Sequence, residues 1–217
     1  MGRLTSFAKE LWTADGLLGR RVAGVDEVGR GALAGSIVGA AVYYDLDAVE
    51  EYLEELYEVR DSKKLSEPHR RSAATAIRLR AGGFAIFEYT CQEIDRYGIQ
   101  PCNRGLIDAA QAWAEAAGCD ALVVDGTIRP SSPSAGMRVE VRPRADGSSL
   151  AVASASILAK VSRDSDMRSA EYLYPGYGFL RNVGYGSPEH LAALATLGST
   201  EIHRQCFLSK VAVADHG

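Results

Sequence analysis

The sequence lacks several features that would assign it to a common class of protein. Its four cysteines form no C-x-x-C pair, which argues against a zinc ribbon and a disulfide scaffold and fits a reducing cytoplasm. The longest membrane-like stretch, residues 32–44, is shorter than the ~20 apolar residues that a spanning helix needs. Residues 1–21 show no basic start followed by an apolar run, so no secretory signal is expected. These absences predict a cytoplasmic globular protein.

Internal repeats and the serine-hydrolase motif are absent as well. No segment recurs at a fixed period, which excludes solenoids and propellers. No G-x-S-x-G elbow occurs, so a serine hydrolase is not supported. A chain of 217 residues suits one large domain. We expect an extension over residues 1–20, a single folded domain over 21–209 and a tail over 210–217.

Excess positive charge is also missing, because the net charge is −4. A nucleic-acid partner would favour lysine and arginine, which neutralise phosphates. However, residues 45–60 hold seven acids and one base, and the rest of the chain then carries 21 acids against 23 bases. The overall acidity therefore does not exclude a nucleic-acid substrate.

The order of the predicted elements indicates the fold class. Apolar, β-branched patterns predict strands over residues 21–25, 36–44, 84–89, 121–124 and 138–142. Helical spacing and capping residues predict helices over residues 67–80, 103–117, 149–160 and 187–197. Early neighbouring strands followed by alternating strands and helices predict an α/β layer fold, with a mixed central sheet flanked by helices on both faces.

Acidic residues follow two of the predicted strands. Asp26 and Glu27 come directly after the first strand, and Asp125 ends the buried run of residues 121–124. Neighbouring side chains of a strand point to opposite faces, so Asp26 and Glu27 serve one site only if the backbone bends. Taken alone, such a pair is more often a solvated strand end. Asp146, before the helix at residue 149, is equally compatible with a ligand role and with a helix cap or turn.

Carboxylates without a matching histidine or cysteine cluster suit hard cations such as Mg²⁺ or Mn²⁺ rather than zinc. The four histidines are scattered along the sequence. Gly29, Gly31 and Gly35 do not have the spacing of a dinucleotide-binding loop, and the adjacent acids would repel a pyrophosphate. Metal-assisted chemistry is therefore the favoured class.

Seven motifs, in order, resemble ribonuclease HII over residues 21–207, nearly the whole chain. Each motif is weak alone, but the seven in this order and spacing are specific. The matching segments are Val25–Gly31 with Leu33–Gly35, Asp61–Ser66, Val124–Gly126, Ala155–Val161 with Arg163–Asp164, Tyr174–Phe179, Gly184–Gly186 with His190, and His203–Arg204.

The resemblance implies a ribonuclease H fold and assigns roles to individual residues. By the resemblance, four acids hold two Mg²⁺ or Mn²⁺ ions, the Gly-Arg-Gly motif contacts the 2′-hydroxyl of a ribonucleotide, a tyrosine stacks on the next sugar, and two lysines contact phosphate. These residues are Asp26, Glu27, Asp125 and Asp146 for the metal ions, and Gly29, Arg30, Gly31, Tyr185, Lys63 and Lys64 for the substrate.

The activity implied is hydrolysis of RNA paired with DNA, and cleavage on the 5′ side of single ribonucleotides in duplex DNA. The products carry 3′-hydroxyl and 5′-phosphate ends, and this cleavage initiates removal of misincorporated ribonucleotides. We expect a monomer with no membrane partner. Two alternatives stay open: a related two-metal nuclease or recombinase that cuts plain DNA, and a noncatalytic module that binds hybrids.

Overall fold

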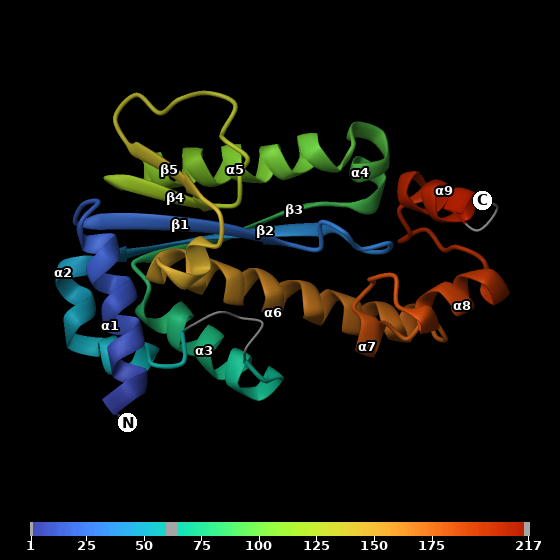
Figure 1. Cartoon of the computed structure of the whole chain (residues 1–217), viewed down its shortest axis with the longest axis horizontal. Coiled ribbons are helices and arrows are strands. Elements are labelled where there is room, and N and C mark those ends of the chain that lie inside the picture. The colour runs from blue at the N-terminus through green and yellow to red at the C-terminus, as the bar shows by residue number, and fades with distance from the viewer. Residues whose placement is uncertain (1, 60–64, 215–217) are drawn as a thin grey trace.

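One five-stranded mixed sheet forms the centre of the protein. The computed structural model describes residues 2–59 and 65–214. β1, β2 and β3 are antiparallel neighbours, whereas β4 and β5 run parallel to β1. The order across the sheet is β3-β2-β1-β4-β5 (Figure 1). The strands are β1 (Arg21–Val28), β2 (Ile37–Asp45), β3 (Gly83–Tyr89), β4 (Ala121–Asp125) and β5 (Arg138–Arg142).

Helices cover both faces of this sheet, which confirms the predicted α/β class. α4 and α5 lie on one face, and α6, α3 and α1 lie on the other (Figure 1). Within the described part of the chain, no helix has the length and apolar character that a bilayer crossing requires. The helices are α1 (Gly2–Gly16), α2 (Leu46–Val49), η1 (Glu50–Leu56), α3 (Glu67–Arg80), α4 (Cys91–Tyr97), α5 (Ile99–Ala116), η3 (Ala145–Gly147), α6 (Leu150–Leu173), α7 (Phe179–Asn182), α8 (Pro188–Leu197) and α9 (Gln205–Ala214).

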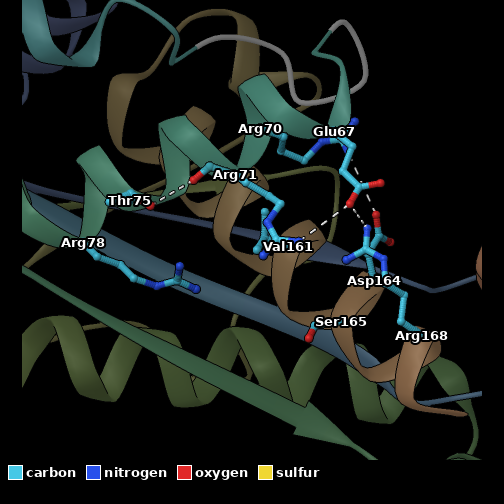
Figure 2. Close-up of a pocket in the computed structure, with 9 residues that line it drawn as sticks. All are labelled: Glu67, Arg70, Arg71, Thr75, Arg78, Val161, Asp164, Ser165 and Arg168. Atoms are coloured by element: carbon cyan, nitrogen blue, oxygen red, sulfur yellow. Dashed lines mark hydrogen bonds and ion pairs between the residues drawn. The ribbon is translucent and has the colours of Figure 1, made fainter.

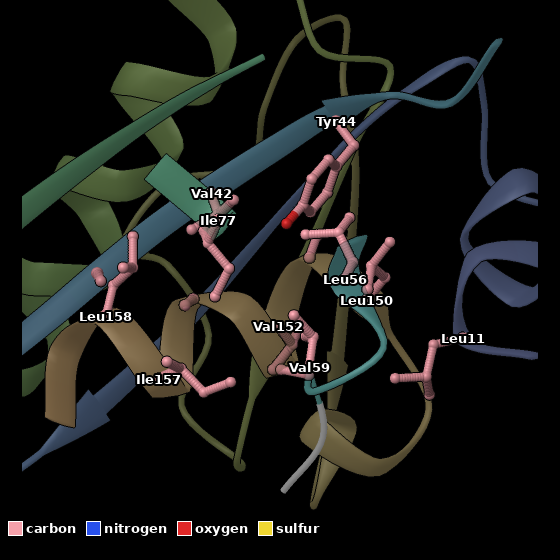
Figure 3. Packing of buried hydrophobic residues seen from close by; sticks show 14 of the residues in the cluster. Leu11, Val42, Tyr44, Leu56, Val59, Ile77, Leu150, Val152, Ile157 and Leu158 are labelled. Carbon is pink, nitrogen blue, oxygen red and sulfur yellow. The ribbon is translucent and has the colours of Figure 1, made fainter. Parts of the chain in front are cut away.

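Helix α6 lies against the sheet along its first ten residues, 150–159, all of which are buried and all of which are apolar apart from two serines. Its side chains pack with residues from β2, α3 and η1 (Figure 3). Helix α6 approaches β1 closely at Gly24, where a Cβ would lie 2.2 Å from the backbone nitrogen of Val152. Only glycine fits there, so the sequence of β1 sets the distance between sheet and helix.

The N-terminal segment, expected to be an extension outside the folded domain, contributes α1 to this same face. Leu11 is buried in the core cluster, and the indole of Trp12 donates a hydrogen bond to the Leu46 carbonyl at 3.0 Å. The buried Asp15 accepts a hydrogen bond from the backbone nitrogen of Ala151 at 3.1 Å, in the first turn of α6. Burial raises the pKa of Asp15 to about 6.

The predicted elements agree with the observed ones in type. α3 has the predicted bounds, and Ser66 takes its N-cap position, although its side chain makes no capping hydrogen bond. α6 extends to Leu173 rather than ending at residue 160. The sequence after residue 160 is largely polar, but Arg163 and Met167 are buried there and continue the buried side of the helix. α9 follows the last helix that the sequence predicts.

Candidate active site

Asp26 of β1 and Asp125, the last residue of β4, lie near each other on two adjacent parallel strands. β1 continues to Val28, so Asp26 and Glu27 lie within the strand rather than directly after it. Val25 of β1 is paired with Val124 of β4, and each aspartate directly follows the last residue at which these two strands pair with each other. Asp125 shares a face of its strand with Val123, which packs in the α6-side core. Asp26 hydrogen-bonds with a side chain of α6 and therefore lies on the same face. The sheet topology thus brings together two carboxylates that are 99 positions apart in the sequence.

The environment of Asp26 disfavours its charged form. The pKa of Asp26 is raised to about 7, first by burial and then by the nearby carboxylates of Asp125 and Glu27. A side-chain hydrogen bond with Ser156 of α6 and one from the backbone nitrogen of Glu27, at 2.7 Å, act in the opposite direction. Repulsion among the acids contributes to the raised pKa, but burial is the larger cause.

Glu27 lies on the opposite face of β1, toward α5. Its Oε1 accepts a hydrogen bond from the Nδ2 of Asn103 at 3.1 Å. Burial raises the pKa of Glu27, while the Asn103 hydrogen bond and the charge of Arg30 lower it. Asn103 is not among the residues predicted from the sequence, where its only signal is a polar residue on the apolar side of a helix.

Asp125 also anchors the turn that carries Asp146. The Oδ1 of Asp125 accepts a hydrogen bond from the backbone nitrogen of Ala145 at 2.6 Å, at the start of η3. Asp146 is the next residue. The N-cap of α6 is Ser149, whose side chain accepts from the Val152 nitrogen, so Asp146 is not the cap of this helix. Its role as a metal ligand stays a prediction.

The donor set fits hard divalent cations, because it consists of carboxylate oxygens whose negative charges the surroundings leave largely uncompensated. As their side chains stand, the described residues form no group of three or more His, Cys, Asp or Glu that could hold a metal ion. One reason is that Asn103 holds the Glu27 side chain on the opposite face of the sheet from Asp26 and Asp125. The four-acid centre therefore stays a prediction.

The Gly29–Gly31 loop lies beside this carboxylate pair. Gly29 has φ +89°, and a Cβ there would lie 2.2 Å from the Nε of Arg163, so the position requires glycine. Its backbone nitrogen donates a hydrogen bond to the hydroxyl of Tyr185 at 3.2 Å. Arg30 is exposed, and a Cβ on Gly31 would meet open space. The fold thus joins two predicted substrate-contacting elements that are 156 residues apart.

Buried Arg163 holds this region in place. The Arg163 residue is only 1% exposed to solvent. Its guanidinium donates hydrogen bonds to the carbonyls of Ser36 at 3.0 Å, Ala34 at 2.9 Å and Val183 at 2.6 Å. Its guanidinium also lies 5.4 Å from the centre of the Tyr185 ring. One arginine thereby ties the loop after β1 to the segment that carries Tyr185.

Arg204 supports the same loop from the other side. It is fully buried and donates to the carbonyl of Gly35 at 2.8 Å and to that of Arg30 at 3.2 Å. Its own backbone nitrogen donates to the carbonyl of Leu33 at 2.8 Å. Neither arginine could be given a supporting role from the sequence, because a charged side chain is normally expected at the surface.

Lys63 and Lys64, the predicted phosphate contacts, lie outside the described residues. Helix α3 begins just after them, and a cleft of about 180 Å³ separates it from α6 (Figure 2). Ion pairs cross this cleft: Glu67 pairs with Arg168, and Asp164 lies 3.9 Å from Arg70. Among the described residues, those that line the cleft include none of the predicted site residues. Its lining includes four arginines and two acids, namely Arg70, Arg71, Arg78, Arg168, Glu67 and Asp164.

Comparisons with known proteins identify the family of this chain. The family model for ribonuclease HII matches residues 23–210. Ribonuclease HII of Rhodospirillum rubrum is 45% identical over 191 residues, covering 87% of this chain and 84% of that protein. Ribonuclease HII of Clostridium acetobutylicum is 39% identical, covering 94% of this chain and 78% of that protein.

Solved structures show the same fold. The RNase HII in the PCNA:RNase HII complex from Archaeoglobus fulgidus superposes with a TM-score of 0.68 at 25% identity, covering 85% of this chain and 93% of that one. Bst-RNase HIII in complex with Mn²⁺ gives a TM-score of 0.63 at 21% identity, covering 84% of this chain and 72% of that one. The second likeness concerns the fold alone. From the family match and the close relatives, the chain belongs to the ribonuclease HII family and is a ribonuclease H-type endoribonuclease.

Proposed function

We propose that this enzyme is a metal-dependent endonuclease that cleaves the RNA strand of RNA–DNA hybrids and cuts 5′ of single ribonucleotides in duplex DNA. The products would carry 3′-hydroxyl and 5′-phosphate ends, and the cut would initiate removal of misincorporated ribonucleotides. The observation that carries this proposal is the proximity of Asp26 and Asp125 on adjacent strands, beside the contact between Gly29 and Tyr185.

Asp26, Glu27, Asp125 and Asp146 are proposed to hold two Mg²⁺ or Mn²⁺ ions. Bound ions would activate a water molecule and neutralise charge that develops on the scissile phosphate. The protein's own contribution is a half-buried group of carboxylates, in which burial first and neighbouring acids second raise the pKa values of Asp26 and Glu27. Bst-RNase HIII, which shares the fold, was solved in complex with Mn²⁺, and this agrees with the proposed choice of metal.

The loop of Gly29, Arg30 and Gly31 is proposed to read the 2′-hydroxyl. Only this group distinguishes a ribonucleotide from a deoxyribonucleotide at a single position, so the reader must approach the sugar closely. Gly31, with open space where a side chain would be, permits such an approach by the backbone. Tyr185, fixed to Gly29 through its hydroxyl, would then stack on the neighbouring sugar.

Contacts with the phosphate backbone are proposed for Lys63 and Lys64. The arginines of the cleft between α3 and α6 add positive charge along these two helices, although ion pairs already engage several of them. The catalytic unit is proposed to span residues 21–209, with residues 1–20 as an N-terminal extension whose helix α1 packs against it and residues 210–217 as a tail. We further propose that the enzyme acts in the cytoplasm as a monomer.

One cleavage assay tests the proposed function. Duplex DNA with a single ribonucleotide, with and without Mg²⁺, is compared with an all-DNA duplex of the same sequence. We expect one cut 5′ of the ribonucleotide, only with metal, and none in the control duplex. The Asp125→Asn variant should bind the duplex but not cut it. Equal cutting of both duplexes would instead indicate a general nuclease, and binding without cutting by the wild type would indicate a noncatalytic module.

A further inference from the structure

His190 and His203 form a buried pair behind Tyr185. Their side chains are 0% and 1% exposed, and their Nε2 atoms lie 3.1 Å apart. His190 lies in the first turn of α8, and His203 forms an isolated bridge with Ala34. The four histidines are scattered along the sequence, but the fold brings these two into contact.

The two ends of this pair determine where each proton lies. The backbone nitrogen of Thr200 donates to Nδ1 of His203 at 2.9 Å, so Nδ1 carries no proton and Nε2 does. At the other end, Nδ1 of His190 lies 2.9 Å from the carbonyl of Tyr185, which only accepts, so Nδ1 is the donor. His203 therefore donates to His190, and a directed chain of hydrogen bonds runs from Thr200 to Tyr185.

The packing around the pair keeps both rings neutral. Phe179 meets His190 edge to face at 5.3 Å between ring centres, and Tyr177 lies 5.0 Å from His203. Burial lowers the pKa of both histidines, and that of His203 falls to about 4 with a further effect from His190. Each ring thus carries a single proton at neutral pH, as the hydrogen-bond chain requires.

The pair acts on the backbone of Tyr185. The Tyr185 carbonyl also accepts from the Ser187 nitrogen at 2.8 Å, and the Tyr185 nitrogen donates to the Asn182 carbonyl at 2.9 Å. The ring has different partners: its hydroxyl accepts a hydrogen bond from Gly29, and the Arg163 guanidinium lies over its face. A shift of this backbone would therefore move the ring relative to the Gly29 loop.

We propose that His190 and His203 are positioning residues that aim the Tyr185 ring at the sugar next to the cleaved ribonucleotide. The inference rests on the proposed function, because it assigns Tyr185 a substrate contact. The histidines themselves are too deeply buried to touch a nucleic acid. Their effect on cleavage has to pass through Tyr185.

Two substitutions of His190 separate its two hydrogen bonds. In His190→Asn the amide nitrogen takes the place of Nδ1 and keeps the bond to Tyr185, whereas in His190→Gln the longer amide reaches His203 instead. We expect His190→Gln to lower kcat/KM on the single-ribonucleotide duplex about tenfold, and His190→Asn to stay within about threefold of wild type. Because the shorter asparagine leaves a cavity, it should be the less stable variant by thermal denaturation. His190→Gln is thus expected to be the less active variant, and His190→Asn the less stable one.

A double-mutant cycle tests whether the effect passes through Tyr185. In a Tyr185→Ala background, His190→Gln should cause no further loss of kcat/KM. The exposed His69 on α3 provides a control, since His69→Gln should leave both kinetic constants unchanged. Activity that follows stability in both His190 variants, or full additivity with Tyr185→Ala, would overturn the inference.

The protonation of the two histidines can also be measured on the wild type, so that this test does not depend on whether a variant folds. Nitrogen-15 NMR should show the imidazole proton on Nδ1 of His190 and on Nε2 of His203, and the opposite or doubly protonated forms at neutral pH would also overturn the inference. Failure of the proposed function is distinguishable, because the wild type itself would then not cut the ribonucleotide duplex.

Discussion

Replacing Asp26 with asparagine should stabilise the protein while abolishing cleavage. The pKa of Asp26 rises from the ordinary 3.8 to about 7, which corresponds to about 4 kcal/mol at about 1.4 kcal/mol per tenfold change in acidity. Between these values the folded protein keeps the proton and the unfolded chain releases it, so the stability of the wild type falls as pH rises. Above about pH 7 the full cost of the buried charge is present.

Asparagine has nearly the same shape without the charge. We therefore expect Asp26→Asn to be up to about 4 kcal/mol more stable than wild type at pH 8 without metal, and equally stable near pH 4. The figure is an upper bound because Asp26 keeps partial contact with solvent. Urea denaturation followed by circular dichroism, in a chelator at several pH values, measures the difference.

Asp45 at the end of β2 provides the matched control. It is a half-exposed carboxylate, 3.6 Å from Arg21, and Asp45→Asn should change stability by less than about 1 kcal/mol at either pH. If Asp26→Asn were less stable than wild type at pH 8, or if its advantage persisted undiminished at pH 4, burial of the Asp26 charge would not be the cause of the raised pKa.

Three further predictions concern packing, the buried arginine and metal. Gly24→Ala should destabilise the fold by about 3 kcal/mol or more in urea titration, because the new Cβ would lie 2.2 Å from the Val152 nitrogen and α6 must shift; a neutral effect would contradict this close approach. Arg163→Lys should cost about 2–4 kcal/mol, since a lysine does not reach all three carbonyls that the guanidinium binds, and a wild-type melting temperature would refute this role. Mg²⁺ at a hundred times its Kd should stabilise the wild type by about 2.7 kcal/mol, a melting shift of about 5–10 °C, whereas Asp125→Asn should lose most of it; equal shifts in both proteins would argue against a shared cation site.

Local patterns were sufficient to predict much of the fold. The strands and α3 could be located because their signals lie within each segment: alternating or continuous apolar residues, Ser66 at the cap and Pro68 in the first turn. Asp125 could be identified in the same way, since an apolar run ending in an acid and a glycine marks the end of a buried strand. The motif order added the family, which the comparisons confirm.

Other features depend on how distant segments meet. The faces toward which Asp26 and Glu27 point follow from which helix covers each side of the sheet, so Asn103 could not be recognised as a partner of Glu27. The burial of Arg163 likewise depends on three carbonyls from separate loops. A charged residue in a helix carries no local sign of such partners.

The sequence by itself therefore determined the elements, the acids at the strand ends and the family, because each is encoded by neighbouring residues or by motif order. Only the tertiary structure decided that Asp26 lies near Asp125 and that Gly29 donates a hydrogen bond to the hydroxyl of Tyr185. The same holds for the hydrogen bond between His190 and His203. The physical reason is that these contacts join segments far apart in the chain, and their geometry exists only once the sheet has assembled and α6 has packed on it.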